Sequence, residues 1–116
     1  MVSLAIFIIS VHPKKPTITS SPPSGITTVG EKFELTCQTE SQGPQTNYTF
    51  YKGNTPIVNN GPENSTLTIS SAQKIDNGEY SCQVEIEGVK SNISSTQLIR
   101  IIGKNVLFIL KIVNIY

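Results

Sequence analysis

Apolar and polar side chains alternate along the middle of the chain, from about residue 31 onward. In the segment 31–39, phenylalanine, leucine and cysteine occupy every second position and polar residues lie between them. The same period of two residues recurs in the segments 48–52, 65–70 and 79–87. This period is typical of a strand with one buried face, so the pattern predicts four β-strands.

Shorter apolar segments flank these four and indicate further strands at 17–19, 26–29, 55–58 and 91–101. Eight glycines and seven prolines, many beside asparagine, provide turn signals between the segments. Seven or eight short strands in about 88 residues are typical of a two-sheet sandwich. We therefore predict an all-β fold.

The first 13 residues are leader-like, because Val2–Ile9 is an almost unbroken apolar run. No basic residue precedes this run, and the bulky Ile8 would occupy the third position before a cut after Ser10, where a small residue is required. Three interpretations stay open for residues 1–13. They are a short divergent signal peptide, the remainder of a truncated one, or an unrelated strand.

The last residues are also apolar, but Arg100, Lys104 and Lys111 interrupt them. A spanning helix needs roughly 20 mostly apolar residues, so we do not predict a membrane span here. Either the tail 103–116 packs on a neighbour outside this chain, or it is the end of a fragment, which we favour. The remaining segment, 14–102, is the predicted domain.

Composition excludes several classes of function. The net charge of +1 is too small to attract a phosphate backbone, so we expect no nucleic-acid partner. One histidine, two cysteines and no tryptophan leave few residues for a metal site or for catalysis. We expect no enzyme activity, no cofactor and no metal.

The two cysteines, Cys37 and Cys82, lie on the apolar faces of two predicted strands. In a sandwich they could join sheets packed about 10 Å apart. Such a bridge would restrict the unfolded chain by roughly 4 kcal/mol in the entropy model. The alternative is a pair of reduced, buried thiols in a cytosolic protein.

The sequence Asp76-Asn-Gly-Glu-Tyr-Ser-Cys82 resembles the start of strand F in immunoglobulin domains. There, the glycine allows the tight turn into the strand and the tyrosine hydroxyl bonds back to the main chain, as in a tyrosine corner. Residues 29–37, 48–54 and 65–69 resemble strands B, C and E of the same family. The resemblance implies a two-sheet Greek-key sandwich with an inter-sheet disulfide. The core positions it implies are Phe50, Leu67, Asp76, Gly78 and Tyr80.

The chain also departs from the family pattern. Phe50 stands where the strand C tryptophan is usual, and its ring can still pack against the disulfide. No basic residue between Lys52 and Lys74 can pair with Asp76, so we expect Asp76 to cap its own turn. The distance between the cysteines leaves no room for the extra strands of a variable domain. The constant-2 or intermediate set fits instead, and this set is typical of cell-surface receptors.

The segments 47–57, 65–72 and 76–84 are similar to the ectodomain repeats of Fc receptors and Fc receptor-like proteins. This resemblance implies an extracellular module of a type I leukocyte membrane receptor. Its partners would be a protein ligand, either immunoglobulin Fc or another cell-surface protein, and neighbouring immunoglobulin domains of the same chain. The alternatives are a spacer or adhesion domain, and a secreted decoy.

The resemblance places ligand contacts in three loops at one end of the sandwich, 40–46, 58–63 and 86–90. These loops hold no aromatic or arginine anchor of the kind that dominates binding hot spots, which keeps the spacer alternative open. Three Asn-x-Ser/Thr sequons predict surface glycosylation if the chain is secreted. The candidate ligand contacts are Gln42, Gln45, Asn59, Asn60, Glu87 and Val89, and the candidate glycosylation sites are Asn47, Asn64 and Asn92.

Overall fold

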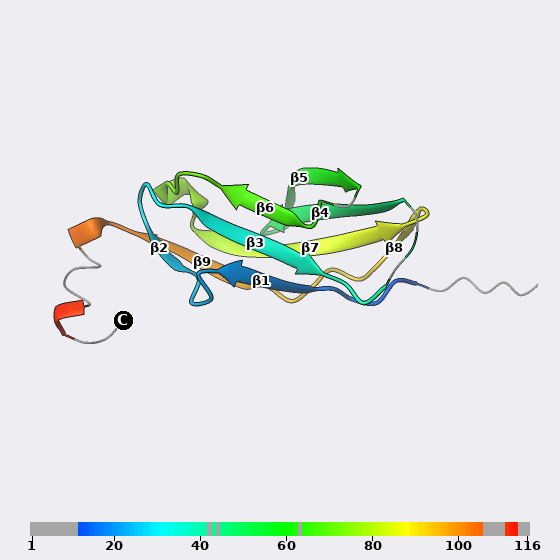
Figure 1. Ribbon diagram of the computed structural model, residues 1–116, viewed down its shortest axis with the longest axis horizontal. Coiled ribbons are helices and arrows are strands. Elements are labelled where there is room, and N and C mark those ends of the chain that lie inside the picture. Colours follow the sequence, from blue (N-terminus) through cyan, green and yellow to red (C-terminus); the bar gives the residue numbers. More distant parts are fainter. Residues whose placement is uncertain (1–11, 42, 44, 63, 106–110, 114–116) are drawn as a thin grey trace, which may run out of the picture.

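Two β-sheets packed face to face form the protein (Figure 1). The computed structural model describes residues 12–41, 43, 45–62, 64–105 and 111–113. The elements are β1 (Thr17–Ser21), β2 (Ile26–Thr28), β3 (Phe33–Gln38), β4 (Thr46–Lys52), β5 (Thr55–Pro62), β6 (Thr66–Ile69), the 3-10 helix η2 (Lys74–Asp76), β7 (Gly78–Ile86), β8 (Val89–Lys90) and β9 (Gln97–Ile102).

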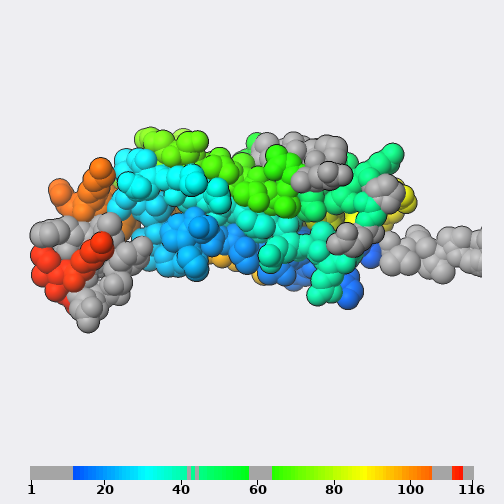
Figure 2. Space-filling model, viewed as in Figure 1, coloured from blue at the N-terminus to red at the C-terminus, as the bar shows by residue number. Residues whose placement is uncertain are grey.

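The smaller sheet has the strand order β1-β3-β6, and the larger one has the order β2-β9-β7-β4-β5 with β8 paired to β7. Every strand pair is antiparallel except β2 with β9, which is parallel. In Figure 2 the residues of β1, β3 and β6 cover the face towards the viewer. This arrangement confirms the predicted two-sheet immunoglobulin-like sandwich.

The chain changes sheets between β1 and β2. A turn at Pro22–Gly25, closed by a 3.0 Å bond from the Gly25 N–H to the Pro22 carbonyl, carries the chain across. Gly25 has φ +77°, and a Cβ there would collide with the carbonyl oxygen of Leu98. Only glycine fits this close approach to β9. The sequence predicts both strands but not their separation into different sheets.

Side chains from both sheets fill a core that alternation along the strands predicts. In β3 the burial pattern alternates from Phe33 to Cys37, and Phe33 meets Tyr80 of β7 edge to face, with ring centroids 6.4 Å apart. A disulfide between Cys37 and Cys82 joins the sheets, with a Cα–Cα distance of 6.0 Å. The predicted bridge is therefore confirmed. The buried apolar residues are Ile18, Phe33, Leu35, Cys37, Phe50, Ala72, Tyr80, Cys82, Val84, Ile99 and Ile101.

Three expected element boundaries are wrong. Residues 58–63 were expected in a loop, but β5 continues through Pro62. Among the described strands β5 pairs with β4 alone, and the pairing has two register shifts, so an edge position accommodates Asn, Gly and Pro in this strand. The last strand was expected at 91–101, but residues 91–96 are not in a strand and β9 begins only at Gln97. β8 lies in the segment 86–90, which was expected to be a loop.

Candidate functional site

The end of the sandwich where the N-terminal segment enters carries two of the three predicted ligand loops. We call this end the N-terminal pole, and it comprises residues 12–16, the β3–β4 loop (described residues 39–41, 43 and 45) and the β7–β8 turn (86–89). The Glu87 N–H donates to the Gln45 carbonyl at 3.4 Å and joins the turn to the loop. The pole is thus one continuous surface made from segments far apart in the sequence.

The N-terminal segment is attached to this pole. The Lys14 N–H donates to Ser41 Oγ at 2.8 Å, and Lys14 Nζ lies 3.0 Å from Glu40 Oε1. Nδ1 of His12 lies 3.4 Å from the carbonyl oxygen of Lys90. Because the Lys14 and Glu40 side chains are 72% and 80% exposed, their ion pair contributes less than about 1 kcal/mol.

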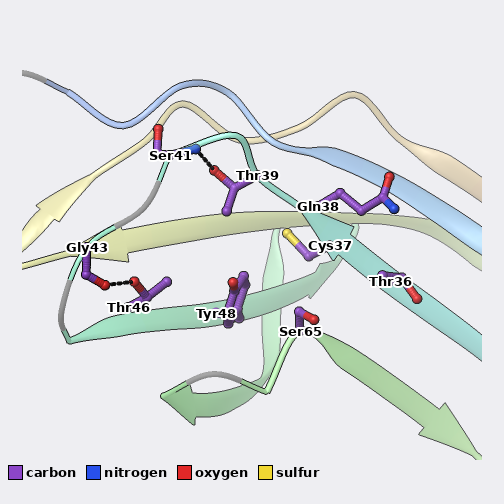
Figure 3. Close-up of a pocket in the computed structure, with 9 residues that line it drawn as sticks. All are labelled: Thr36, Cys37, Gln38, Thr39, Ser41, Gly43, Thr46, Tyr48 and Ser65. Carbon is purple, nitrogen blue, oxygen red and sulfur yellow. Dashed lines mark hydrogen bonds between the residues drawn. The ribbon is translucent and has the colours of Figure 1, made fainter.

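A hollow of about 620 Å³ opens beside the β3–β4 loop (Figure 3). The Ser41 N–H donates to Thr39 Oγ1 at 3.0 Å, and the Thr46 hydroxyl donates to the Gly43 carbonyl at 2.7 Å. Hydrogen bonds within the β3–β4 loop thus hold the residues that line this side of the hollow. None of the lining residues is charged. The hollow suits neutral polar groups of a protein surface. Its lining consists of Thr36, Cys37, Gln38, Thr39, Ser41, Gly43, Thr46, Tyr48 and Ser65.

The predicted ligand contacts do not all meet at the pole. Gln45 and Glu87 lie side by side there and are exposed, and Val89 is half-buried in β8. Asn59 and Asn60 lie in β5 and not in a loop, which corrects their expected placement. Gln42 lies outside the described residues.

Glu87 and Gly88 form the two-residue turn between β7 and β8, with φ of +50° and +82°. Positive φ at both central positions is the geometry of a type I′ hairpin turn, which favours Asn-Gly. Glutamate tolerates this conformation less well than asparagine does. We expect Glu87→Asn to raise the free energy of unfolding by about 0.5–1 kcal/mol, measured by urea denaturation. No gain, with the fold intact, would contradict this reading of the turn.

Near the opposite end, the Tyr80 hydroxyl donates to the Asp76 carbonyl at 2.6 Å, which is a tyrosine corner. The Asp76 carboxylate accepts the Gln73 N–H at 2.8 Å and caps the turn that contains η2. Gly78 begins β7 with φ +155°. Together these bonds set the direction in which β7 enters the core.

Burial raises the pKa of the Tyr80 phenol from 10.0 to about 12, and the negative charge of Asp76 adds to the rise. The unfolded chain loses this proton first, so folding stability is kept below pH 10.0 and falls as the pH rises towards about 12. A pKa difference of this size corresponds to a free energy on the order of 3 kcal/mol.

Urea denaturation at several alkaline pH values tests this expectation. Tyr80→Phe should lower stability at neutral pH by about 1 kcal/mol, because it removes the hydrogen bond to Asp76. Above pH 10.0 the variant should lose less stability than the wild-type protein. Tyr51→Phe keeps Tyr80 and should follow the wild-type slope. Equal slopes for all three proteins would contradict the assignment.

Two buried serines hold the segment between β8 and β9 against β7. The Cys82 N–H donates to Ser94 Oγ at 2.9 Å, and the Val84 N–H donates to Ser91 Oγ at 3.1 Å. In return, the Ser94 and Ser91 N–H groups donate to the Cys82 and Val84 carbonyls, both at 2.8 Å. Each hydroxyl thus takes the place of a strand carbonyl. The alternation of apolar and polar residues does not reveal this role; the spacing of Ser91 and Ser94, shortly after the strand that contains Cys82, is its one signal in the sequence.

The three sequons lie in different settings. Asn47 is half-buried within β4, which is paired on both sides. Asn64 is exposed just before β6, and Asn92 is exposed in the segment between β8 and β9. In the described part of the chain, no group of three His, Cys, Asp or Glu side chains is placed to hold a metal ion. No helix there is long and apolar enough to cross a bilayer.

Comparison with known proteins accords with this geometry. The second Ig-C2 domain of human Fc-receptor like A matches with a TM-score of 0.63 and 25% identity, over 77% of this chain and 98% of that domain. Extracellular domains 3–5 of Drosophila OTK match in fold, with a TM-score of 0.54 and 23% identity, over 66% of this chain and 32% of theirs. No curated protein matches. The sequence pattern of the immunoglobulin domain covers residues 15–85, so the chain belongs to the immunoglobulin domain family.

Proposed function

We propose that this chain is an extracellular module of a cell-surface immune receptor of the Fc receptor-like type, and that it acts by non-covalent protein recognition. The observation that carries the proposal is the similarity to an Ig-C2 domain of human Fc-receptor like A over 98% of that domain. The motifs in the segments 47–57, 65–72 and 76–84 support the same assignment.

The disulfide supports an extracellular location. Cys37 and Cys82 are 1% and 0% exposed, and their bond joins the two sheets of the core. Structural disulfides of this kind form and persist in the secretory pathway and outside the cell, and are rare in the cytosol. We therefore place the domain on the outer side of the plasma membrane or in secreted form.

We assign recognition to the N-terminal pole. Gln45 and Glu87 are exposed and a main-chain hydrogen bond joins them, so their side chains contribute to one polar surface. The neighbouring hollow offers hydroxyl groups without charge. A polar protein surface with a basic group opposite Glu87 would complement this arrangement. Immunoglobulin Fc is the ligand that the family resemblance implies.

A spacer or adhesion role is the second candidate, and one observation favours it. Lys14 binds Ser41 and Glu40, so polar groups of the β3–β4 loop are already bonded within the pole. Among the described pole residues there is no exposed aromatic or arginine side chain, and these dominate binding hot spots. A spacer would set the distance between neighbouring domains without contacting a ligand.

Surface binding to immobilised Fc separates the two roles. The oxidised 116-residue chain, with its bridge verified by mass, should bind at tens of micromolar. Glu87→Arg should weaken binding by about fivefold or more, because it reverses the charge at the position that we expect to face a basic group of the ligand. Glu31→Arg makes the same change on an exposed residue at the other end and should stay within about twofold.

No binding by the folded chain would overturn Fc recognition and leave the spacer or adhesion role. Sedimentation of the same sample then distinguishes these, because an adhesion module that pairs with itself would form dimers with rising concentration. Equal weakening by both charge reversals would instead overturn the assignment of recognition to the N-terminal pole.

A further inference from the structure

The two ends of the Asn92-Ile93-Ser94 sequon lie in opposite environments. Asn92 is exposed, and Ile93 beside it is 45% exposed. Ser94 is only 6% exposed, although its hydroxyl is the second group that defines the sequon. A glycosylating enzyme that needs both groups therefore finds only one of them on the folded surface.

Hydrogen bonds hold the Ser94 hydroxyl inside. Its oxygen accepts the Cys82 N–H at 2.9 Å, and the hydroxyl donates to the Ser95 carbonyl at 2.7 Å. The Ser94 N–H donates to the Cys82 carbonyl at 2.8 Å, which closes a reciprocal pair. Withdrawing Ser94 from this position would leave a buried Cys82 N–H without a partner, which is costly.

The hydrogen-bond partner of Ser94 is Cys82, one of the two cysteines of the disulfide. Cys82 is bonded through its sulfur to Cys37 and through its main chain to Ser94. Ser91 makes the same reciprocal pair with Val84, two residues further along β7. Cys82 therefore connects the disulfide directly to the segment that carries the sequon.

We propose that glycosylation of Asn92 competes with formation of the Cys37–Cys82 bridge, and that folding closes this sequon. The inference rests on the extracellular location proposed above. Before oxidation the Ser94 hydroxyl is accessible and Asn92 accepts a glycan. After oxidation the hydroxyl is bonded to Cys82 and Asn92 stays unmodified. The folded protein is then a mixture of chains with and without a glycan at Asn92. The ratio of the two forms depends on which of the two reactions occurs first.

The secretory lumen supplies the co-reactants of both reactions, glycosylation of Asn92 and oxidation of the two cysteines. In the first, the Asn92 amide nitrogen attacks the anomeric carbon of an oligosaccharide carried on a polyprenyl pyrophosphate. A carbon–nitrogen bond forms, the bond to pyrophosphate breaks, and the amide gives up one proton. In the second, two thiols lose two electrons and two protons to a thiol–disulfide oxidant of the lumen, which is reduced.

Asn64 supplies an internal reference. It is exposed and precedes β6, an edge strand paired only with β3. The three sequons lie on separate tryptic peptides, 33–52, 53–74 and 91–100, because lysine or arginine ends each one. Occupancy at Asn92 can therefore be divided by occupancy at Asn64 in one digest.

The experiment expresses the full chain behind a cleavable secretory leader in cultured human cells, with and without a membrane-permeant thiol reductant. Glycans are removed by peptide N-glycosidase in heavy-oxygen water, and each peptide is quantified by mass. We expect the Asn92-to-Asn64 ratio to rise about twofold or more with reductant, because disulfide formation slows. Cys82→Ser should raise the Asn92-to-Asn64 ratio without reductant. Glu79→Gln changes an exposed residue of the same strand and should leave this ratio unchanged.

The outcomes separate the two proposals. Occupancy at Asn64 with an Asn92 ratio unchanged by reductant and by Cys82→Ser would overturn the competition and leave the extracellular assignment standing. Because the added leader directs the chain into the lumen, these occupancies test the competition alone. A ratio that stays at zero under every condition, with Asn64 occupied, would also overturn the competition, whereas the binding experiment on Fc tests the proposed function separately.

Discussion

Replacing both cysteines, in the variant Cys37→Ala/Cys82→Ala, is expected to lower the free energy of unfolding by about 4 kcal/mol. The bridge joins positions 45 residues apart, so removing it frees a long loop in the unfolded chain. A loss of this size is comparable with the whole net stability of a small domain. Urea denaturation followed by circular dichroism measures it.

The reduced wild-type protein is the matched control. It lacks the bridge but keeps both sulfur atoms, which are almost fully buried. Loss of chain restriction should appear equally in the reduced protein and in the double variant, and any additional loss in the variant reports packing. A double variant that loses less than about 1 kcal/mol would contradict the loop-entropy account.

The second large effect is expected at Phe50. This ring is 0% exposed, at the middle of β4, and its cross-strand neighbours are Cys82 on one side and Val58 on the other. Phe50→Ala should lower the free energy of unfolding by about 3–5 kcal/mol, because it removes apolar contacts and leaves a cavity beside the disulfide. The same urea titration measures the change.

Tyr51→Ala is the matched control for Phe50→Ala. Tyr51 is the next residue of β4, is half-buried on the opposite face and bonds through its hydroxyl to Gln83 at 2.8 Å. Its truncation should cost clearly less, because water can reach the vacated space. Equal losses for the two variants would mean that Phe50 does not fill the position that the family's tryptophan usually occupies.

Alternation predicted the four central strands, and it agrees with burial most closely in β3, where every second residue from Phe33 to Cys37 is buried. The pattern in β3 and β7 placed both cysteines on the buried faces of their strands, where they could form the bridge that the structure contains. These strands are paired within their sheets and packed on the disulfide, so local periodicity and tertiary burial agree. Where they agree, sequence alone is sufficient.

Prediction failed where tertiary contacts override local composition. Asn-Gly-Pro in β5 has the composition of a turn, yet pairing with β4 on one side keeps the segment extended. Ser91 and Ser94 were included in one continuous strand, because periodicity does not reveal that their hydroxyls replace carbonyl acceptors. The contact between Gln45 and Glu87 depends on loop geometry that no spacing encodes.

The candidate site was predictable only in part for the same reason. The motif around Tyr80 located β7, and the resemblance then located the loops at its ends. Which loop residues meet depends on the folded backbone, which brings Lys14 to Ser41 and Glu87 to Gln45. Binding residues on loops are chosen by the scaffold beneath them more than by their own sequence.

The parallel pairing of β2 with β9 also determines how the domain would bear tension. Ile26 is paired with Arg100 and Thr28 with Ile102, so a pull applied to residues 26 and 102 slides the two strands past each other. All hydrogen bonds between them are then loaded in shear at once, and none can be peeled singly. Beyond that point the Cys37–Cys82 bond spans 45 residues and shortens the extended chain by about 150 Å, which caps how far one module can lengthen.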